Sequence, residues 1–163
     1  MVSLSAQALE LTSPDVKPGA GLALDQVNSR CGGGDHSPAL AWSGEPAGTR
    51  SFAITMFDPD AGGGRGFWHW LVMDIPAGTR SLPVDAGAGA GLPERSIQTE
   101  NDFGEPRYGG ACPPRGSGVH HYVFTLYALD QAAAPTRSGP AVLSPFLKQH
   151  ALATATLTAI YSR

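Results

Sequence analysis

The stretch Ser51–Pro76, SFAITMFDPDAGGGRGFWHWLVMDIP, decides the fold class. It holds two nearly continuous apolar runs, which we expect to form strands over Ser51–Phe57 and Trp68–Ile75 on either side of a glycine-rich turn. Because both runs are apolar throughout and do not alternate, the strands should be central and covered on both faces. The turn has ionisable side chains at both ends, Asp58 and His69, and this placement indicates a function.

The rest of the chain continues the β pattern. The strongest strand signal is HHYVFTLYAL at His120–Leu129. Further on, Ser144 followed by Pro145 is typical of a helix start, and FLKQHAL should continue that helix. The final ATATLTAIY alternates as in a strand with one wet face. We therefore predict a mainly β protein, a β-sandwich with short helical additions, one of them near the C-terminus.

Composition limits the classes of function. The chain has 163 residues and 42% hydrophobic content, which is enough for one domain over residues 1–163. Its net charge of −3 comes without a cluster of lysine and arginine, which argues against nucleic acid or an anionic membrane surface as partner. No apolar run is long enough for stable membrane insertion, and the N-terminus lacks a signal-peptide pattern. We expect a cytoplasmic protein.

Two further features concern loops. Cys31 and Cys112 form no metal-binding spacing, so two free or buried thiols are the expected state in a reducing compartment, with a disulfide as the alternative. The segment from Leu82 to Gly118 has no hydrophobic periodicity. Since compact domains rarely carry so much irregular chain without using it, this segment is a candidate binding region.

The candidate site follows from strand geometry. Residues two apart in a strand face the same way, so His120 and Tyr122 share a face while His121 points to the other. If the strands that carry His69 and His120 are neighbours, two imidazoles and a phenol converge beside Asp58, whose carboxylate can fix a histidine tautomer. Such convergent donors favour a small anion: phosphate, sulfate or carboxylate.

Other residues near the turn have structural interpretations. In a regular strand the tryptophans on either side of His69 both point away from it, and we expect Trp70 in the core. Trp68, next to the turn, stays a candidate for the pocket wall. Asp60 is expected to cap its loop.

Other chemistries have weaker support. AGGGRG lacks the GK[ST] of a phosphate-binding P-loop. Ser117, in RGSGV, is outside a G-x-S-x-G elbow, and no histidine and aspartate pattern points to it. A zinc site made of His69, His120 and Asp58 stays a minor alternative, because no ligand spacing supports it. We expect no metal and no cofactor.

Taken together, these motifs resemble a known family. DPDA, WHW, GGACPP and GVHHYVFTLYAL, in this order and at these intervals, are similar to the phosphatidylethanolamine-binding proteins, specifically their compact bacterial and archaeal Raf-kinase-inhibitor-like branch. The similarity extends from Leu22 to Tyr161 through SPALAW, NDFG and HALATATLTAIY. It implies a large central antiparallel sheet packed with a smaller second sheet and short peripheral helices, with an anion pocket at the end of the large sheet.

The resemblance also implies a set of site residues and two departures. After DPDA this chain has glycines where the family commonly has proline, and His121 stands where the family usually has arginine. The ligand-binding set on this reading is Asp58, Trp68, His69, Gly110, Pro113, Pro114, His120 and Tyr122.

Three functions remain open. The leading one is binding of a small anionic ligand, such as phosphate, a phosphorylated metabolite or a phospholipid head group, with a regulatory role. The second is inhibition of a protease or kinase through a surface loop, which some relatives perform. The third is an enzyme that uses Asp58, His69, His120 and Tyr122 for acid–base chemistry in a biosynthetic pathway. A homodimer is compatible with the resemblance.

Overall fold

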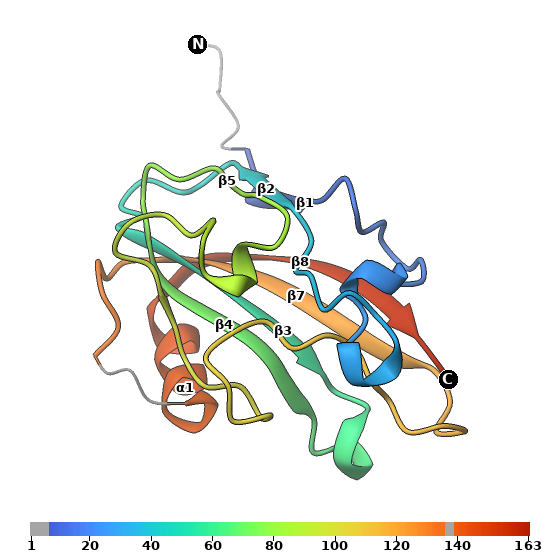
Figure 1. Ribbon diagram of the computed structural model, residues 1–163. Helices are drawn as coiled ribbons and strands as arrows, with labels where there is room; N and C mark the ends of the chain where they lie inside the picture. Colours follow the sequence, from blue (N-terminus) through green and yellow to red (C-terminus); the bar gives the residue numbers. More distant parts are fainter. Residues whose placement is uncertain (1–6, 136–138) are drawn as a thin grey trace.

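The computed structural model describes residues 7–135 and 139–163 and arranges them as two antiparallel sheets and a helix (Figure 1). The large sheet has five strands, in the spatial order β6 (Ile97–Gln98), β4 (Phe67–Pro76), β3 (Ser51–Asp58), β7 (His120–Leu129) and β8 (Ala151–Tyr161). The small sheet has the order β1 (Glu10–Thr12), β2 (Leu40–Ser43) and β5 (Ser81–Leu82). Helix α1 spans Pro140–His150, and short 3₁₀ turns occupy Leu24–Gln26 (η1), Ser29–Cys31 (η2), Ala61–Gly64 (η3) and Ala86–Ala88 (η4).

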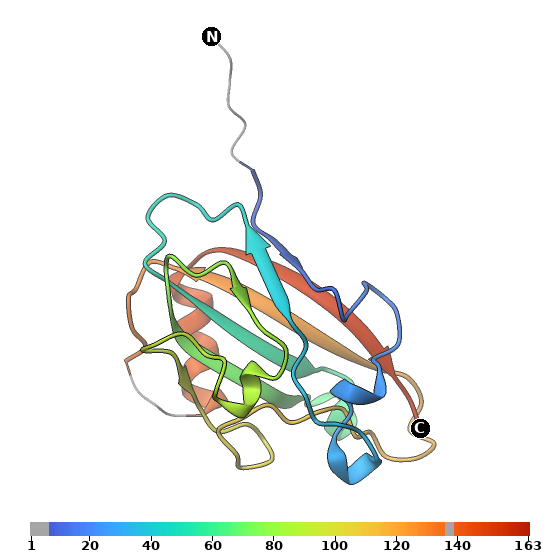
Figure 2. The same cartoon turned by 45° about the horizontal axis from the view of Figure 1, so that its top comes forward.

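The large sheet is covered on both faces. The small sheet packs on one face and α1 on the other (Figures 1 and 2). Buried apolar side chains from both sheets fill the core between them, among them Leu40, Trp42, Leu82, Phe52, Ile54, Trp70 and Phe124. On the opposite face, Leu143 and Leu147 of α1 pack on Ala53, Leu71 and Met73. This arrangement confirms the expected mainly β fold.

The three strands expected to be central are indeed internal. Strands β3, β4 and β7 match the expected ranges to within one residue at each end. Nearly every side chain of β3 is buried, because this strand lies in the middle of a sheet with two covers. Continuous apolar runs therefore predicted the correct strands for the correct physical reason.

The condition that the strands carrying His69 and His120 are neighbours is not met. Strand β3 lies between β4, which carries His69, and β7, which carries His120, so these two strands are not neighbours. The residues still meet at the end of the sheet, where β3 stops at Asp58.

The helix begins earlier than expected. It starts at Pro140, so Ser144 and Pro145 lie inside it and do not begin it. A proline is tolerated in the first turn of a helix because the N–H that it lacks would have no partner there. Pro140 and Pro145 both give this start signal in the sequence, and the helix begins at the first of them. The helix also ends at His150, and the alanine and leucine that follow already belong to β8.

A β-bulge sits at the centre of the site. Met56 pairs with Trp70 and the next residue, Phe57, pairs with Trp68, so His69 is an extra residue in β4. A bulge resets the alternation of faces. The two tryptophans therefore point to opposite faces, contrary to the regular alternation expected from the sequence: Trp70 is fully buried in the core between the sheets, while Trp68 packs on the α1 side.

Candidate functional site

A cavity of about 410 Å³ opens at the end of the large sheet. Its walls come from the end of β3, the turn before β4, the loop before β7 and the first residues of β7. The β3–β4 turn, the loop before β7 and the C-terminus lie at this end of the molecule (Figures 1 and 2). The residues that line it are Asp58, Asp60, Ala61, Gly62, Gly63, Phe67, His69, Phe103, Cys112, Pro113, Pro114, Ser117, His120 and Tyr122.

Asp58 builds the turn and also orients a histidine. Its Oδ1 accepts the backbone N–H of Asp60 at 2.9 Å, as aspartate commonly does at a turn before proline. Its Oδ2 lies 2.6 Å from Nδ1 of His120, and both side chains are buried, with 2% and 4% of their surface exposed. A carboxylate only accepts, so Nδ1 of His120 carries the proton and Nε2 is directed to the cavity side.

His69 is held differently. Its Nδ1 lies 2.8 Å from the backbone oxygen of Gly109, which can only accept, so Nδ1 carries a proton and Nε2 is left for the cavity. Burial lowers the pKa of His69, and the hydrogen bond to Gly109 and the nearby Asp58 offset this in part. At neutral pH the imidazole is uncharged, and Nε2 is an acceptor.

Tyr122 presents an unsatisfied donor. Its side chain is fully buried and lines the cavity, and its hydroxyl has no hydrogen-bond partner among the described residues. Its ring packs edge-to-face on His69, with centroids 5.3 Å apart, and is stacked with His120 at 6.5 Å. Burial, and next the negative charge of Asp58, raise the pKa of Tyr122, so this hydroxyl keeps its proton as a donor.

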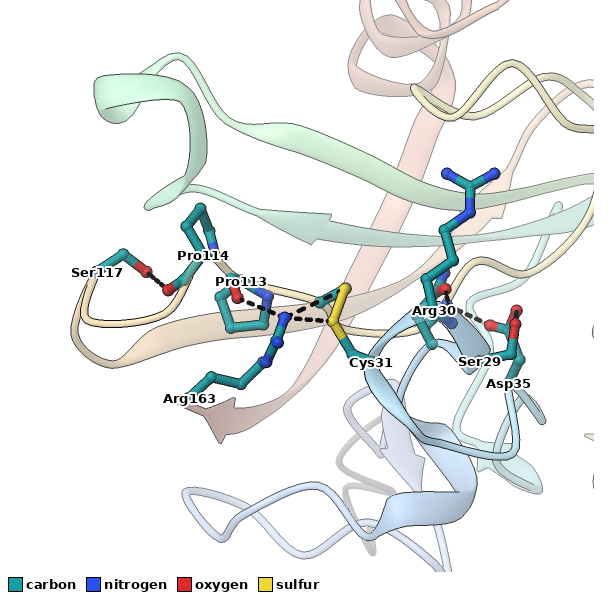
Figure 3. The surroundings of a disulfide bond; sticks show 11 residues. Ser29, Arg30, Cys31, Asp35, Pro113, Pro114, Ser117 and Arg163 are labelled. Carbon is teal, nitrogen blue, oxygen red and sulfur yellow. Dashed lines mark hydrogen bonds between the residues drawn. A yellow bond between two sulfur atoms is a disulfide. The ribbon is translucent and has the colours of Figure 1, made fainter.

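The cavity wall formed by Pro113 and Pro114 is tied to a distant segment. A disulfide joins Cys112 to Cys31, whose Cα atoms are 5.6 Å apart, and the Arg163 guanidinium donates toward the sulfur atoms and the Pro113 carbonyl (Figure 3). The expectation of two free or buried thiols is therefore wrong, and the alternative, a disulfide, is what the structure shows. The fold brings the two cysteines within bonding range, although 81 positions separate them in sequence.

Two of the expected site residues lie outside the cavity. The Trp68 ring packs against Phe57, with centroids 4.5 Å apart, on the face that α1 covers. Gly110 donates its N–H to the Asp35 carboxylate at 2.7 Å, and a Cβ there would overlap the backbone around Val27. Gly110 is thus a packing position. The other six expected residues come together around one cavity.

Among the lining residues that sequence reasoning did not assign to the pocket, three contact its histidines. Phe67 and Phe103 pack against His69, at centroid distances of 5.0 and 5.4 Å. Phe103 is held there by the buried Asn101, whose Oδ1 accepts the Phe103 N–H and whose Nδ2 donates to the His69 carbonyl. The sequence signal that could have pointed to Phe103 was an asparagine two residues before an aromatic residue in a loop.

Ser117 is the third missed residue. The sequence showed no histidine and aspartate pattern that points to it, and the conclusion that it lies apart from such residues is wrong. Its Oγ lies 2.9 Å from Nε2 of His120, the same imidazole that Asp58 orients. The spacing of three residues between Ser117 and His120 is a weak signal, because the turn that joins them cannot be recognised without the fold.

Asp60 and His121 form a pair on the outer side of the turn. The Asp60 carboxylate accepts from both the backbone N–H and Nδ1 of His121, each at 2.8 Å, and these bonds lower the pKa of Asp60. Asp60 therefore ties its loop to β7, and its side chain makes no capping hydrogen bond to the 3₁₀ turn η3.

The ionisable residues that line the cavity are two aspartates, two histidines and Tyr122; the lining set contains neither lysine nor arginine. Within the described parts of the chain, no three histidine, cysteine, aspartate or glutamate side chains are grouped to hold a metal ion. In the same parts, no helix is both long and apolar enough to cross a membrane.

Comparisons with known proteins match the chain over nearly its whole length. A family model described as phosphatidylethanolamine-binding protein matches residues 12–162. The chain is 46% identical to UPF0098 protein YbcL of Escherichia coli K12 over 98% of this chain and 90% of YbcL. It is 42% identical to UPF0098 protein YbhB of the same strain, over 94% of this chain and 100% of YbhB. The crystal structure of E. coli YbcL, described as a new member of the mammalian PEBP family, superposes with a TM-score of 0.92 and 44% identity, over 96% of this chain and 99% of that one.

Proposed function

The chain belongs to the phosphatidylethanolamine-binding protein family, and from that premise we propose that its cavity binds a small phosphate-bearing ligand together with one proton. The observation that carries this proposal is the buried, unpartnered hydroxyl of Tyr122. An unsatisfied buried donor costs about 1–3 kcal/mol, and a ligand oxygen that accepts from it removes this cost.

The charges of the cavity indicate why a proton accompanies the ligand. A doubly charged phosphate would meet the Asp58 carboxylate and the acceptor Nε2 of His69, with no fixed cation among the lining residues. A singly charged phosphate ester can donate its own P–O–H to Nε2. Alternatively, His69 takes up the proton and donates to the phosphate. Both routes bind one proton with the ligand.

The remaining lining residues indicate the organic part of the ligand. Phe67, Phe103, Pro113 and Pro114 present apolar surface around the polar cluster. A cavity of about 410 Å³ has room for a phosphate and a small apolar group. Phenyl phosphate is therefore a suitable probe, with inorganic phosphate as the minimal one.

Calorimetric titration with phenyl phosphate tests the proposal. In Tyr122→Phe the affinity should fall about tenfold to a hundredfold, because a hydrogen bond to a charged group is worth about 1.5–3 kcal/mol. Tyr127→Phe is the matched control, since Tyr127 is on the same strand but packs on the α1 side. Equal affinities in wild type and Tyr122→Phe, or no binding to either protein, would refute the proposal.

The pH dependence tests the proton. Affinity for phenyl phosphate should fall as pH rises from about 6 to 8, because the second phosphate pKa is about 6 and burial lowers the pKa of His69 from its ordinary value. The titration is repeated in two buffers with different ionisation enthalpies. The heat difference should report uptake of about one proton from neutral pH upward, where the free ligand is a dianion, and little uptake at about pH 5, where the ligand already carries that proton. Affinity independent of pH would show that the ligand binds as a dianion at neutral donors.

A further inference from the structure

We propose that Ser117, at the mouth of the cavity, is a nucleophile activated by His120 and Asp58, and that it accepts the acyl group of small uncharged carboxylic esters. This activity would be separate from phosphate binding, although it uses the same cavity. It makes the protein a candidate esterase or acyl carrier.

The geometry is that of a serine–imidazole–carboxylate relay. Ser117 Oγ lies 2.9 Å from His120 Nε2, and His120 Nδ1 lies 2.6 Å from Asp58 Oδ2. Asp58 and His120 are buried, whereas Ser117 is exposed and lines the cavity. A nucleophile within hydrogen-bond reach of a base that a third group orients is the arrangement that activates serine hydroxyls.

The proton positions are consistent with this role. Because Asp58 holds the proton of His120 on Nδ1, the uncharged imidazole presents its lone pair at Nε2. The Ser117 hydroxyl also lies 2.7 Å from the Pro114 carbonyl oxygen (Figure 3). Rotation of this one hydrogen from the carbonyl toward Nε2 gives the reactive form without movement of a heavy atom.

The acylation step is balanced as follows. Ser117 Oγ attacks the ester carbonyl carbon, and its proton passes to His120 Nε2. The bond from carbon to the alcohol oxygen then breaks, and the alcohol leaves with the proton from Nε2. Water, deprotonated by His120, attacks the acyl-serine; the carboxylic acid is released and Ser117 regains its proton. The Tyr122 hydroxyl, which has no partner within the described residues, is the donor assigned to the developing oxyanion.

The lining residues define the substrate class. Phe67, Phe103, Pro113 and Pro114 surround the reacting groups with apolar surface. Asp58 and Asp60 disfavour an ester with a negative charge, since the lining set holds no fixed cation to balance it. Short-chain esters with an uncharged alcohol or phenol fit these conditions.

The experiment is a burst assay with p-nitrophenyl acetate on the full chain. Wild type should release nitrophenolate in a burst close to one equivalent, and peptide mapping should find the acetyl group on Ser117. In Ser117→Ala the burst should be lost, with an acylation rate lower by about 10²–10⁴-fold, whereas Ser117→Cys should still be acylated. Ser81→Ala, an exposed serine on the small sheet, is the matched control and should behave as wild type.

A pH profile tests the imidazole. The titratable groups near His120 are Asp58, Asp60 and Tyr122, together with Tyr161, which pairs with it from β8. Assistance by His120 predicts an acylation rate that rises and then levels off between about pH 5 and 8, whereas an unassisted hydroxyl gives a rate that continues to rise with hydroxide. Calorimetry of wild type with phenyl phosphate is a readout separate from the burst, so a failure of acylation and a failure of phosphate binding are distinguished.

Three outcomes would overturn the inference. The first is the absence of a burst in wild type. The second is acetylation that persists in Ser117→Ala or maps to other residues. The third is an acylation rate that continues to rise with pH and does not level off. None of them affects the phosphate-binding proposal, which calorimetry tests on its own.

Discussion

His69 and His120 share one cavity, yet their hydrogen-bond partners give them different roles. His120 has a carboxylate at Nδ1, which fixes its tautomer and leaves the lone pair of Nε2 beside Ser117. His69 has a neutral carbonyl at Nδ1, and burial keeps it uncharged. The first histidine is therefore the base of the cavity, and the second is an acceptor that gains a proton only when a ligand brings one.

The depressed pKa of His69 predicts how stability varies with pH. In the unfolded chain this histidine binds a proton below about pH 6.5, whereas the folded protein resists protonation there. The unfolded state then binds more protons, so the free energy of unfolding should fall as pH decreases from about 7.5 to 5. Urea unfolding of wild type and His69→Asn checks this, because asparagine can still donate to Gly109 but does not titrate. The fall should be smaller in His69→Asn and unchanged in His36→Asn, an exposed histidine; equal slopes in all three proteins would contradict the argument.

The unpartnered Tyr122 hydroxyl predicts a substitution that reduces binding without loss of stability. Removal of a buried donor that has no partner abolishes its desolvation cost, so Tyr122→Phe should keep the free energy of unfolding or raise it by up to about 1 kcal/mol. Thermal and urea unfolding without ligand measure this change. A loss of more than about 1 kcal/mol would mean that the hydroxyl is already satisfied in the folded protein.

At the scale of elements, apolar runs predicted the three internal strands, but the bulge in β4 could not be predicted. A strand pattern assumes strict alternation, and an inserted residue shows only when the partner strand is known. Strict alternation would put Trp68 and Trp70 on the same face, whereas the bulge places them on opposite faces. The identification of the cavity itself did not depend on it, because Asp58, His120 and Tyr122 come from strand ends whose faces the sequence predicted.

The interior proline of α1 predicts a stabilising substitution. Pro145 is exposed, and it cannot donate to the carbonyl of Ala141 one turn before it. Pro145→Ala restores that bond and improves helix propensity, and it loses only the smaller entropic advantage of proline in the unfolded chain. We expect the free energy of unfolding to rise by about 1–2 kcal/mol. Val142→Ala, an exposed position in the same helix, should change it by less than about 0.5 kcal/mol. An unchanged or lower stability of Pro145→Ala would show that the helix needs the proline at this position.

At the scale of the whole molecule, the cavity is assembled from segments that are far apart in sequence. The segment from Leu82 to Gly118, which the sequence singled out for its lack of periodicity, supplies five of the lining residues: Phe103, Cys112, Pro113, Pro114 and Ser117. Backbone bonds and a bridge between Val27 and Ala111 hold this segment against the N-terminal loops. The sequence could show that the segment was used but not what it packs against, because that depends on tertiary topology.

The disulfide is the largest correction at this scale, and it also bears on where the protein works. Disulfides persist in oxidising compartments and are rare in the cytoplasm. The free thiols expected from the sequence assumed a reducing cytoplasm, so the bond between Cys31 and Cys112 leaves that location without support from the cysteines. The free energy of unfolding that is lost when this bond is absent decides whether the protein can work in a reducing compartment.

The bond should contribute strongly to stability because it closes a long loop. Its cysteines are 81 positions apart, and loss of such a bond typically costs about 2–5 kcal/mol through the greater freedom of the unfolded chain. The double variant Cys31→Ser and Cys112→Ser should lose that amount in urea unfolding, and reduced wild type should match it. Phenyl phosphate should also bind more weakly to the double variant, because Cys112 lines the cavity and directly precedes its Pro113–Pro114 wall. If thiol titration of the purified protein finds two free cysteines, and the double variant is as stable as wild type, the protein does not depend on an oxidising compartment and the cytoplasmic expectation stands.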